Sequence, residues 1–245
     1  MTLVFDDVTF AYSRFRAPVL HNFGWIVPSS RTVLLGPNGA GKSTVLALGA
    51  DALQPKRGRI RVGELDRSSP QASYRRTVGW MPQQIRAVPG LTVREQVAYA
   101  GWLKGLSRRQ AWDDAPRALA TTGLEGLAQR AASTLSGGEL RRLGIAQTLI
   151  HDARILLLDE PTAGLDPEQR GRFRELIAAI PKDRQIVVST HQVDDLSDLF
   201  EAVVVLAAGK IRYSGSVADF LALGGTEAGT RQAERAYGRV MAGAA

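Results

Sequence analysis

The sequence predicts an α/β fold in which a mostly parallel sheet is covered by helices, and three observations support this. Continuous apolar runs at residues 155–158, 186–189 and 203–206 are typical of buried parallel strands. Helical patterns alternate with these runs, including an amphipathic stretch over residues 168–179. The length of 245 residues suits one large α/β domain, or a domain with a small inserted lobe.

The first third of the chain predicts strands around one helix. Residues 2–35 are β-rich, with short alternating stretches around Leu3, Phe5 and Val8. A glycine-rich turn follows an apolar run at residues 32–35, and residues 43–52 then predict a helix. A further pair of strands is expected over residues 59–62 and 77–81.

The middle and the end of the chain are mainly helical between the apolar strands. Residues 92–132 are helical and alanine-rich, and we expect Pro116 to mark a break or a first turn there. A second helix is expected after Ser136, ending near residue 150. In the tail, Glu227 and Arg231 stand at helical spacing, which predicts a short terminal helix.

Composition excludes several classes of protein. The chain has no cysteine, which excludes disulfide frameworks, thiolate nucleophiles and cysteine-ligated metals. Its apolar runs, such as residues 155–158 and 202–208, are too short to span a bilayer. Asp6 and Asp7 stand where a signal peptide carries basic residues. These features predict a soluble, cytoplasmic protein.

The net charge of +7 raises the question of a nucleic-acid partner. The basic excess lies in the first two-thirds of the chain and is densest at Lys56, Arg57, Arg59 and Arg61. It is not interleaved with aromatic residues, and neither a zinc-finger spacing nor an aromatic RNA-binding signature is present. We interpret it as a solvated basic face, and expect no specific nucleic-acid partner.

Residues 36–44 read GPNGAGKST, which matches the phosphate-binding P-loop pattern in full. Glycines let backbone N–H groups turn toward phosphates where side chains would collide, and the following helix presents its positive end to the same anion. The lysine reaches the β- and γ-phosphates, and the serine hydroxyl ligates Mg²⁺. The predicted nucleotide contacts are Gly36, Asn38, Gly39, Gly41, Lys42, Ser43 and Thr44.

Two carboxylates, Asp159 and Glu160, come directly after the apolar run at residues 155–158. The end of a buried parallel strand lies at the sheet edge where ligands of open α/β folds bind. We therefore predict that Asp159 holds Mg²⁺ and that Glu160 orients and deprotonates an attacking water. The adjacent pair favours water, rather than a second substrate, as the acceptor of the phosphoryl group.

A second candidate anion site is the sequence LSGGE at residues 135–139. Ser136 can cap the following helix, while Gly137 and Gly138 expose further backbone donors. A capping box formed with Glu139 is the alternative interpretation.

At this point the chain clearly resembles the nucleotide-binding subunit of ATP-binding cassette (ABC) transporters. Six motifs stand in the family's order: GPNGAGKST, the glutamine in WMPQQ, LSGGE, ILLLDEP, AGLD and the histidine in STH. The resemblance covers about residues 2–222. It implies a P-loop NTPase with a mostly parallel core sheet, an N-terminal antiparallel β subdomain and an inserted helical subdomain. The cassette would span residues 1–223, the helical subdomain about 84–152, and a short helical tail 224–245.

The resemblance also implies roles for individual residues. Tyr12 stacks on adenine; Gln83, or Gln84 one register on, touches Mg²⁺ and the attacking water; and His191 contacts the γ-phosphate. The residues expected to close over ATP held by the other protomer are Ser136, Gly137 and Gly138, with Asp166 crossing the dimer interface. His21 and His151 match no motif and are expected at the surface.

Two departures from the family's pattern bear on the rate of ATP hydrolysis and leave the type of reaction unchanged. Glu139 stands where the family carries glutamine, and a carboxylate near a γ-phosphate would repel it, so we expect its side chain to point elsewhere. Ser29 and Ser30 occupy a turn where the family more often has glycine and an acidic residue.

The implied function is ATP hydrolysis, with Mg²⁺, in a head-to-tail homodimer that powers separate membrane-spanning permease subunits. We expect the helical lobe to receive them, with Trp80, Leu91, Tyr99 and Trp102 lining or supporting the groove. Residues 91–111 most resemble exporters of drugs, antibiotics or lipids; the alternatives are an importer of a small solute and a cassette ATPase acting on nucleic acid. A GTPase is disfavoured because the NKxD pattern is absent. The expected location is cytoplasmic, on the inner face of the membrane.

Overall fold

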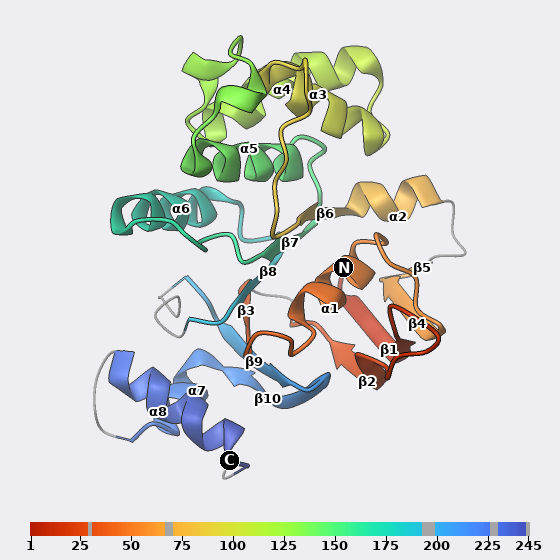
Figure 1. Cartoon of the computed structure of the whole chain (residues 1–245), viewed down its shortest axis with the longest axis vertical. Coiled ribbons are helices and arrows are strands. Elements are labelled where there is room, and N and C mark those ends of the chain that lie inside the picture. The colour runs from red at the N-terminus through yellow and green to blue at the C-terminus, as the bar shows by residue number, and fades with distance from the viewer. Residues whose placement is uncertain (29–30, 67–70, 193–198, 226–229, 244–245) are drawn as a thin grey trace.

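The computed structural model describes residues 1–28, 31–66, 71–192, 199–225 and 230–243. They form two sheets and a separate group of helices (Figure 1). The turn at Ser29 and Ser30, and Glu227 in the tail, lie outside the described residues. Among the described residues, the structure contains no helix that could serve as a membrane span.

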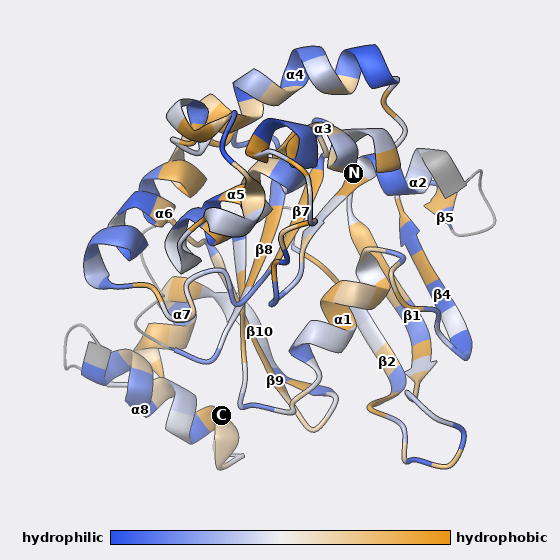
Figure 2. Ribbon diagram, turned by 45° about the horizontal axis from the view of Figure 1, so that its top comes forward, coloured by the Kyte–Doolittle hydropathy of each residue, from blue (hydrophilic) through white to orange (hydrophobic). Residues whose placement is uncertain are grey.

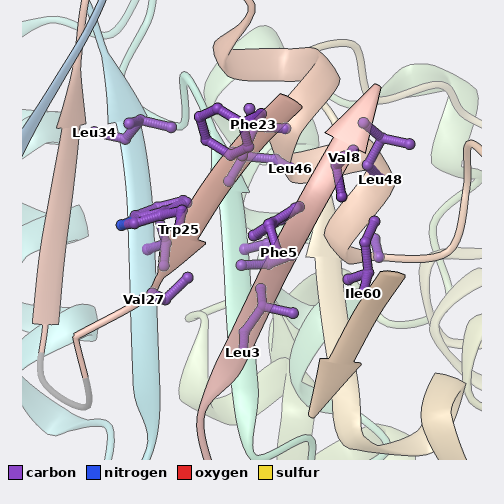
Figure 3. Close-up of a cluster of buried hydrophobic side chains, with 14 of the residues drawn as sticks. Leu3, Phe5, Val8, Phe23, Trp25, Val27, Leu34, Leu46, Leu48 and Ile60 are labelled. Carbon is purple, nitrogen blue, oxygen red and sulfur yellow. The ribbon is translucent and has the colours of Figure 1, made fainter. Parts of the chain in front are cut away.

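The first sheet is antiparallel throughout. Its strand order is β2 (Leu20–Ile26), β1 (Leu3–Phe10), β4 (Arg57–Val62) and β5 (Leu65–Asp66). Alternate residues of these strands point inward, where Phe5 stacks on Trp25 with ring centroids 5.8 Å apart (Figure 3). The predicted N-terminal antiparallel β subdomain is thereby confirmed.

The second sheet has the strand order β10 (Lys210–Ser216), β9 (Ala202–Ala207), β3 (Arg31–Leu35), β8 (Gln185–Thr190), β7 (Ile155–Asp159) and β6 (Val78–Met81). All neighbours are parallel except β10, which is antiparallel to β9. Strands β3, β7, β8 and β9 are buried along their whole length, as continuous apolar runs predict. The predicted mostly parallel core sheet is confirmed.

One predicted pairing is wrong. The strands expected as a pair over residues 59–62 and 77–81 belong to different sheets, because β4 pairs with β1 and β6 pairs with β7. Helix α2 (Gln71–Thr77), which the sequence did not predict, lies between them in the chain. Local patterns identify a strand, but its partner depends on contacts between segments far apart in the sequence.

Helix α1 (Lys42–Gly49) is packed between the two sheets. Its Val45, Leu46 and Leu48 share one hydrophobic cluster with the inner face of the first sheet and with Leu157 of β7. The opposite face of the second sheet is covered by α6 (Pro167–Ala179), α7 (Val217–Ala222) and α8 (Thr230–Met241), which contribute Phe173, Phe220 and Val240 to a second cluster. The predicted terminal helix is present as α8.

The helical lobe contains α3 (Val93–Leu103), α4 (Arg108–Thr121), the 3₁₀ turns Glu125–Leu127 and Ala132–Thr134, and α5 (Gly137–Leu149). It has a third hydrophobic cluster, whose members lie between Val93 and Ile150. In Figure 1 the lobe lies at the end of the molecule away from α7 and α8. Much of α4 has the hydrophilic colour in Figure 2, and its buried residues are Ala111, Ala115, Ala118 and Leu119.

The expected break at Pro116 is wrong, because α4 continues through it. Proline lacks the N–H that would bond the carbonyl four residues earlier. That carbonyl, of Trp112, instead accepts a hydrogen bond of 3.1 Å from Arg94 Nη2 on α3. The chain turns earlier, where Gly105 has φ 93° and Ser107 caps α4 in a box with Gln110.

Candidate nucleotide site

The P-loop connects β3 to α1 and has the geometry of an anion cradle. Gly39 and Gly41 have φ of 79° and 104°, a region that glycine adopts without strain. At Gly36 a Cβ atom would lie 2.3 Å from the carbonyl oxygen of Leu206, so a side chain has no room. No side-chain hydrogen bond caps α1 at Gly41 among the described residues. The N–H groups of its first turn therefore remain available to phosphate oxygens.

Lys42 is buried, with 6% of its side chain exposed, and its ammonium group reaches back over the loop. Nζ donates hydrogen bonds of 2.7 Å to Gly36 O and 3.3 Å to Pro37 O. It also lies 3.5 Å from Glu160 Oε1. Burial lowers the pKa of Lys42 below 10.5, while Glu160 and Asp159 act in the opposite direction. The ammonium group is thus bound by oxygen atoms of the protein, and phosphate oxygens could take their place.

Asp159 is the last residue of β7 and is 2% exposed. Ser189 Oγ on β8 donates a hydrogen bond of 2.6 Å to Asp159 Oδ1. Burial raises the pKa of Asp159 above 3.8, while hydrogen bonds from Ser189 and Ser43 favour the charged form. A buried carboxylate that also contacts Ser43 links the P-loop to the end of β7.

Glu160 has a φ of 49°, the left-handed region, and the next residue is Pro161. Such a conformation costs of the order of 1 kcal/mol for a residue other than glycine, and such residues cluster at active sites. The backbone N–H of Glu160 points to Ser189, with O and Oγ at 3.1 and 3.0 Å. This turn brings the carboxylate back over the sheet edge toward Lys42.

His191 follows β8, and its Nδ1 lies 2.7 Å from Glu160 Oε2. The two oxygens of Glu160 are therefore held by different groups, Oε1 by Lys42 and Oε2 by His191. Because His191 is 41% exposed and Glu160 is 6% exposed, the histidine closes the solvent side of the carboxylate. Lys42 of the P-loop and His191 at the end of β8 thus both contact the carboxylate of Glu160.

Tyr12 stands at the open end of this site. Its hydroxyl shares a hydrogen bond of 3.0 Å with the hydroxyl of Thr44, and its ring makes an edge contact with Phe10 at 5.0 Å. The residue is 62% exposed. A flat aromatic face beside the P-loop is available for stacking on a base.

The LSGGE segment lies at the N-terminus of α5 and forms a complete capping box. Glu139 N donates to Ser136 Oγ at 3.3 Å, and Ser136 N donates to Glu139 Oε2 at 2.7 Å. The carboxylate of Glu139 also lies 4.0 Å from Arg130 Nη1. The expectation that Glu139 points away from a γ-phosphate is consistent with this arrangement, since its side chain folds back onto its own helix.

The remaining predicted residues lie away from the P-loop. Asp166 caps α6, accepting a hydrogen bond of 2.8 Å from Gln169 N. Gln83 and Gln84 are both exposed and line one pocket of about 310 Å³ with Arg141, which donates to Gln83 O. Among the described residues, no hydrogen bond or ion pair links Ser136, Gly137, Gly138 or Asp166 to the P-loop.

Two expectations outside the P-loop need correction. His151, expected at the surface, is 5% exposed and lies two residues after the end of α5. Burial lowers its pKa to about 4, and it interacts with the backbone of Val78 on β6. Trp80 does not line the lobe's groove but packs against the cluster between the sheets. Leu91, Tyr99 and Trp102 do line a groove of about 360 Å³, together with Trp112.

Ser189 is the residue that sequence reasoning missed. It is fully buried and contacts both carboxylate-bearing residues, through Asp159 Oδ1 and Glu160 N. Its position, at the end of the strand next to β7, was visible in the STH motif. Only the strand order shows that residues 159 and 189 are in register.

The residues fit a Mg²⁺ ion held jointly with phosphates. Ser43 and Asp159 supply hydroxyl and carboxylate oxygens, the donors that Mg²⁺ prefers. No group of three or more histidine, aspartate or glutamate side chains among the described residues could hold a metal alone.

A phosphate-binding loop between a buried parallel strand and a helix, with paired carboxylates at the same sheet edge, defines a P-loop nucleoside triphosphatase. The family follows from comparison with known proteins. The family model described as "ABC transporter" matches residues 22–163. The chain belongs to this family, which confirms the predicted resemblance.

Three relatives illustrate the range of the family. The chain is 35% identical to an uncharacterised ABC transporter ATP-binding protein, YxlF of Bacillus subtilis, over 75% of this chain and 61% of that protein. It is 35% identical to the human retinal-specific phospholipid-transporting ATPase ABCA4, over 76% of this chain and 8% of that protein. It is 33% identical to the molybdenum import ATP-binding protein ModC of Brucella suis, over 82% of this chain and 57% of that protein.

Solved structures agree in fold. An ATP-binding subunit of an ABC transporter superposes with a TM-score of 0.83 at 23% identity, covering 98% of this chain and 100% of that chain. A dimeric bacterial ABC transporter cassette superposes with a TM-score of 0.78 at 24% identity, covering 88% of this chain and 98% of the other. The predicted fold class is confirmed. The chain spans 8% to 61% of the length of the three relatives above.

Proposed function

We propose that this chain binds and hydrolyses ATP as the nucleotide-binding cassette of a transporter. The observation that carries the proposal is the placement of Glu160, whose carboxylate lies between Lys42 Nζ at 3.5 Å and His191 Nδ1 at 2.7 Å. A general base must lie within hydrogen-bond reach of the proton it takes and be oriented by its neighbours. Two neighbours orient Glu160 at the edge of the P-loop, which supports this role.

Lys42 and Glu160 exchange partners when ATP binds. In the structure the ammonium is satisfied by Gly36 O, Pro37 O and Glu160. Phosphate oxygens are stronger acceptors than carbonyl oxygens, so Lys42 turns to the β- and γ-phosphates. Glu160 then keeps His191 as its partner and has Oε1 free to accept a proton from the attacking water.

Mg²⁺ would be held by Ser43 and Asp159, with Gln83 reaching it from the helical lobe. When bound, the ion neutralises charge that develops on the phosphates. Ser189 keeps Asp159 in place through its hydrogen bond of 2.6 Å. Tyr12, anchored through its hydroxyl to Thr44 at 3.0 Å, stacks on the adenine.

The chain acts as a head-to-tail homodimer that encloses two ATP molecules. The support is the separation of Ser136, Gly137, Gly138 and Asp166 from the P-loop, which prevents one chain from closing both sides of the same ATP. The similar dimeric cassette has the same fold. ATP then joins the two P-loops to the opposed LSGGE segments, and hydrolysis releases them.

The partners are separate membrane-spanning permease subunits, and the cassette works on the inner face of the membrane. The groove lined by Leu91, Tyr99, Trp102 and Trp112 is their docking site. Its apolar residues are exposed, Trp102 to 45% and Trp112 to 42%, as at interfaces that bind helices. Truncation to Trp102→Ala should weaken co-purification with the permease, and undiminished recovery would exclude this surface.

The cargo is a drug, an antibiotic or a lipid, moved outward. Support comes from the sequence of α3 and from relatives named as phospholipid-transporting ATPases. The alternative is import of a small solute, which the molybdenum import relative favours. A role on nucleic acid is the least supported. Arg57, Arg59 and Arg61 lie on β4, and charges along a strand near a sheet edge discourage strand pairing between molecules.

The test is Glu160→Gln, with Glu234→Gln at an exposed position of α8 as a matched control. Loss of the general base should slow hydrolysis at least about 10²-fold while ATP binding persists. Light scattering should show an ATP-dependent dimer in the Glu160 variant, and the control should match the parent. Near-normal turnover in Glu160→Gln would refute the assignment.

A further inference from the structure

The outer face of the first sheet carries basic side chains that have no role in the proposed function. Directly opposite residues of an antiparallel sheet point to the same side, so cross-strand pairs define the two faces. The pairs of Phe5 with Trp25 and with Ile60 are buried on the inner face (Figure 3). Arg59 and Arg61 flank Ile60 along β4 and therefore point outward, where both are exposed.

Little within the chain neutralises these charges. Among the residues that the structure describes, Arg57 and Arg59 make no hydrogen bond or ion pair. Arg61 Nη1 donates a long hydrogen bond of 3.5 Å to Gly63 O. Asp6 stands directly opposite Arg59 on β1 but forms no ion pair with it. These guanidinium groups are therefore available to an anion from outside the chain.

The basic face continues into the loop between β1 and β2. Lys56, which precedes β4, donates a hydrogen bond of 3.3 Å from Nζ to Ser13 O in that loop. Arg14 and Arg16 flank Phe15, which is 85% exposed, and the guanidinium carbon of Arg14 lies 4.9 Å from the centre of its ring. Arginine and aromatic residues are enriched where proteins bind one another.

This face is separate from the groove proposed for the permease. In Figures 1 and 2, β4 lies at one side of the molecule, whereas α3 and α4 of the helical lobe lie at the top. The residues that line the groove come from α3, α4 and the segment before α3. A partner can therefore bind to the first sheet while the lobe contacts the permease.

The spacing of the charges indicates which kind of anion fits. Alternate residues of a strand lie about 6.6–6.8 Å apart, so Arg59 and Arg61 repeat at that interval. An extended peptide that lies along β4 repeats its side chains at the same interval. A guanidinium group binds a carboxylate through two parallel hydrogen bonds, which favours aspartate or glutamate at alternate positions of such a peptide.

Other polyanions match the face less well. Single-stranded nucleic acid binds where bases stack on aromatic rings, and β1, β2 and β4 expose no phenylalanine, tyrosine or tryptophan. Ile26 lies in the same cross-strand row as Arg61, with Val4 between them, and is 70% exposed. An exposed apolar side chain beside the arginines suits a protein partner better than a hydrated phosphate backbone.

We propose that the outer face of the first sheet, with Arg57, Arg59 and Arg61 on β4, is a docking surface for an extended acidic segment of a partner protein. Carboxylates at alternate positions of that segment pair with Arg59 and Arg61. The sequence alone favoured a face that is only solvated. The inference goes beyond the proposed function and does not rest on it, since none of these residues is assigned there to ATP or to the permease.

The first arm of the test compares two synthetic peptides of the same composition. One has four glutamate–threonine repeats, and its isomer has four glutamates followed by four threonines. Fluorescence anisotropy with the full chain at low ionic strength should show at least about fivefold tighter binding of the alternating peptide, because only its carboxylates match the interval between Arg59 and Arg61. Equal affinities, or no binding of either peptide, would overturn the proposal.

The second arm removes the charges. Arg59→Gln/Arg61→Gln should weaken binding of the alternating peptide about tenfold, and the loss should shrink at high salt because exposed ion pairs are screened. The matched control is Lys210→Gln/Arg212→Gln, which removes two positive charges at the same spacing from exposed positions of β10 and should stay within about twofold of the parent. Urea denaturation should show unchanged stability in both variants. Equal loss of binding in the control would overturn the proposal.

The third arm tests the other polyanions. Vesicles of phosphatidylserine and phosphatidylcholine, and an oligouridylate of eight nucleotides, should each bind more weakly than the alternating peptide. If either binds more tightly, and Arg59→Gln/Arg61→Gln abolishes that binding, the assignment to an acidic protein segment is wrong. The face would then be a site for a membrane or for nucleic acid.

Discussion

Two helices of this chain begin with glycine-rich segments, and they differ in what satisfies their first turns. Helix α1 begins at the P-loop with Gly41 as its N-cap, and no described side chain caps it. Helix α5 begins at the LSGGE segment, where Ser136 and Glu139 form a full capping box. Both helix ends carry the same partial positive charge. Only the first presents unsatisfied N–H groups together with a lysine and two carboxylates.

In the proposed dimer, this difference separates the part of the ATP site that one chain assembles from the part that a second chain would supply. Lys42, Asp159 and Glu160 are all buried around the first helix end, and their chemistry is assembled in one chain. Ser136 and Gly137 are exposed, and the carboxylate of Glu139 already satisfies the Ser136 N–H. A helix N-terminus alone therefore does not make a nucleotide site. The side chains around a helix N-terminus decide which anion it can bind, and whether that anion is held mainly by the same chain or by a second one.

The largest effect on ATP affinity is expected for a change in the P-loop at the start of α1. Lys42→Ala should weaken ATP binding by one chain about 100-fold, since charge-assisted hydrogen bonds contribute about 1.5–3 kcal/mol. Ser136→Ala, at the other helix end, should leave single-chain affinity within about twofold. Isothermal titration of monomeric protein measures both. Equal losses would mean that the LSGGE segment contacts ATP within its own chain.

A second difference concerns the other ends of the two helices. Ala50 and then Asp51 follow α1, whereas Ile150 and then the buried His151 follow α5. The pKa of His151 is lowered to about 4 by burial and by the nearby charge of Lys104. The unfolded chain has a histidine pKa of about 6.5, so between pH 6.5 and 4 it binds more protons than the folded chain. Stability should be complete above pH 6.5 and fall as the pH drops toward 4.

The His151 contribution amounts to about 3 kcal/mol across that interval. Urea denaturation at pH 7 and pH 4.5 should show a smaller pH difference in His151→Phe than in the parent. The control His21→Gln changes an exposed histidine and should keep the parent's pH dependence. If His151→Phe retains the full difference, other groups account for it.

The capping box gives a smaller effect that sharpens the comparison. Ser136→Ala should lower the free energy of unfolding by about 1 kcal/mol through loss of the cap, and also reduce hydrolysis by the assembled pair. Ser107 caps α4 in an equivalent box with Gln110, away from the P-loop. Ser107→Ala should cost similar stability, measured by urea denaturation, with unchanged hydrolysis. If both variants lose activity alike, Ser136 acts only through folding.

The smallest effect concerns charge alone. Glu139→Gln retains an oxygen that can accept from Ser136 N but removes the negative charge beside the helix end, which should cost about 0.5 kcal/mol of stability. Because the negative charge lies at the helix end that would face the partner's ATP, even with the side chain folded back, the ATP concentration that half-saturates dimerisation should fall up to about threefold. Light scattering in the Glu160→Gln background measures it. A rise instead would show that the carboxylate assists closure.

Sequence patterns identify candidate site residues best where one short segment supplies them. The P-loop, the two carboxylates after β7 and the cap at Ser136 follow from local spacing and local backbone preference. Ser189 was missed because its role depends on β8 lying beside β7 in register. The expected break at Pro116 failed because Arg94, on another helix, satisfies the carbonyl that proline leaves open.

The sequence by itself determined the family, the α/β class and the residue types available for phosphate chemistry, because each depends on neighbours along the chain. Only the tertiary structure decided which groups hold Glu160, that His151 is buried, and that Gly144 receives Ile85. Those contacts join strands and helices that are distant in sequence, and close packing accepts few side chains at each point. The spacing of residues along the chain does not show which distant side chains pack together.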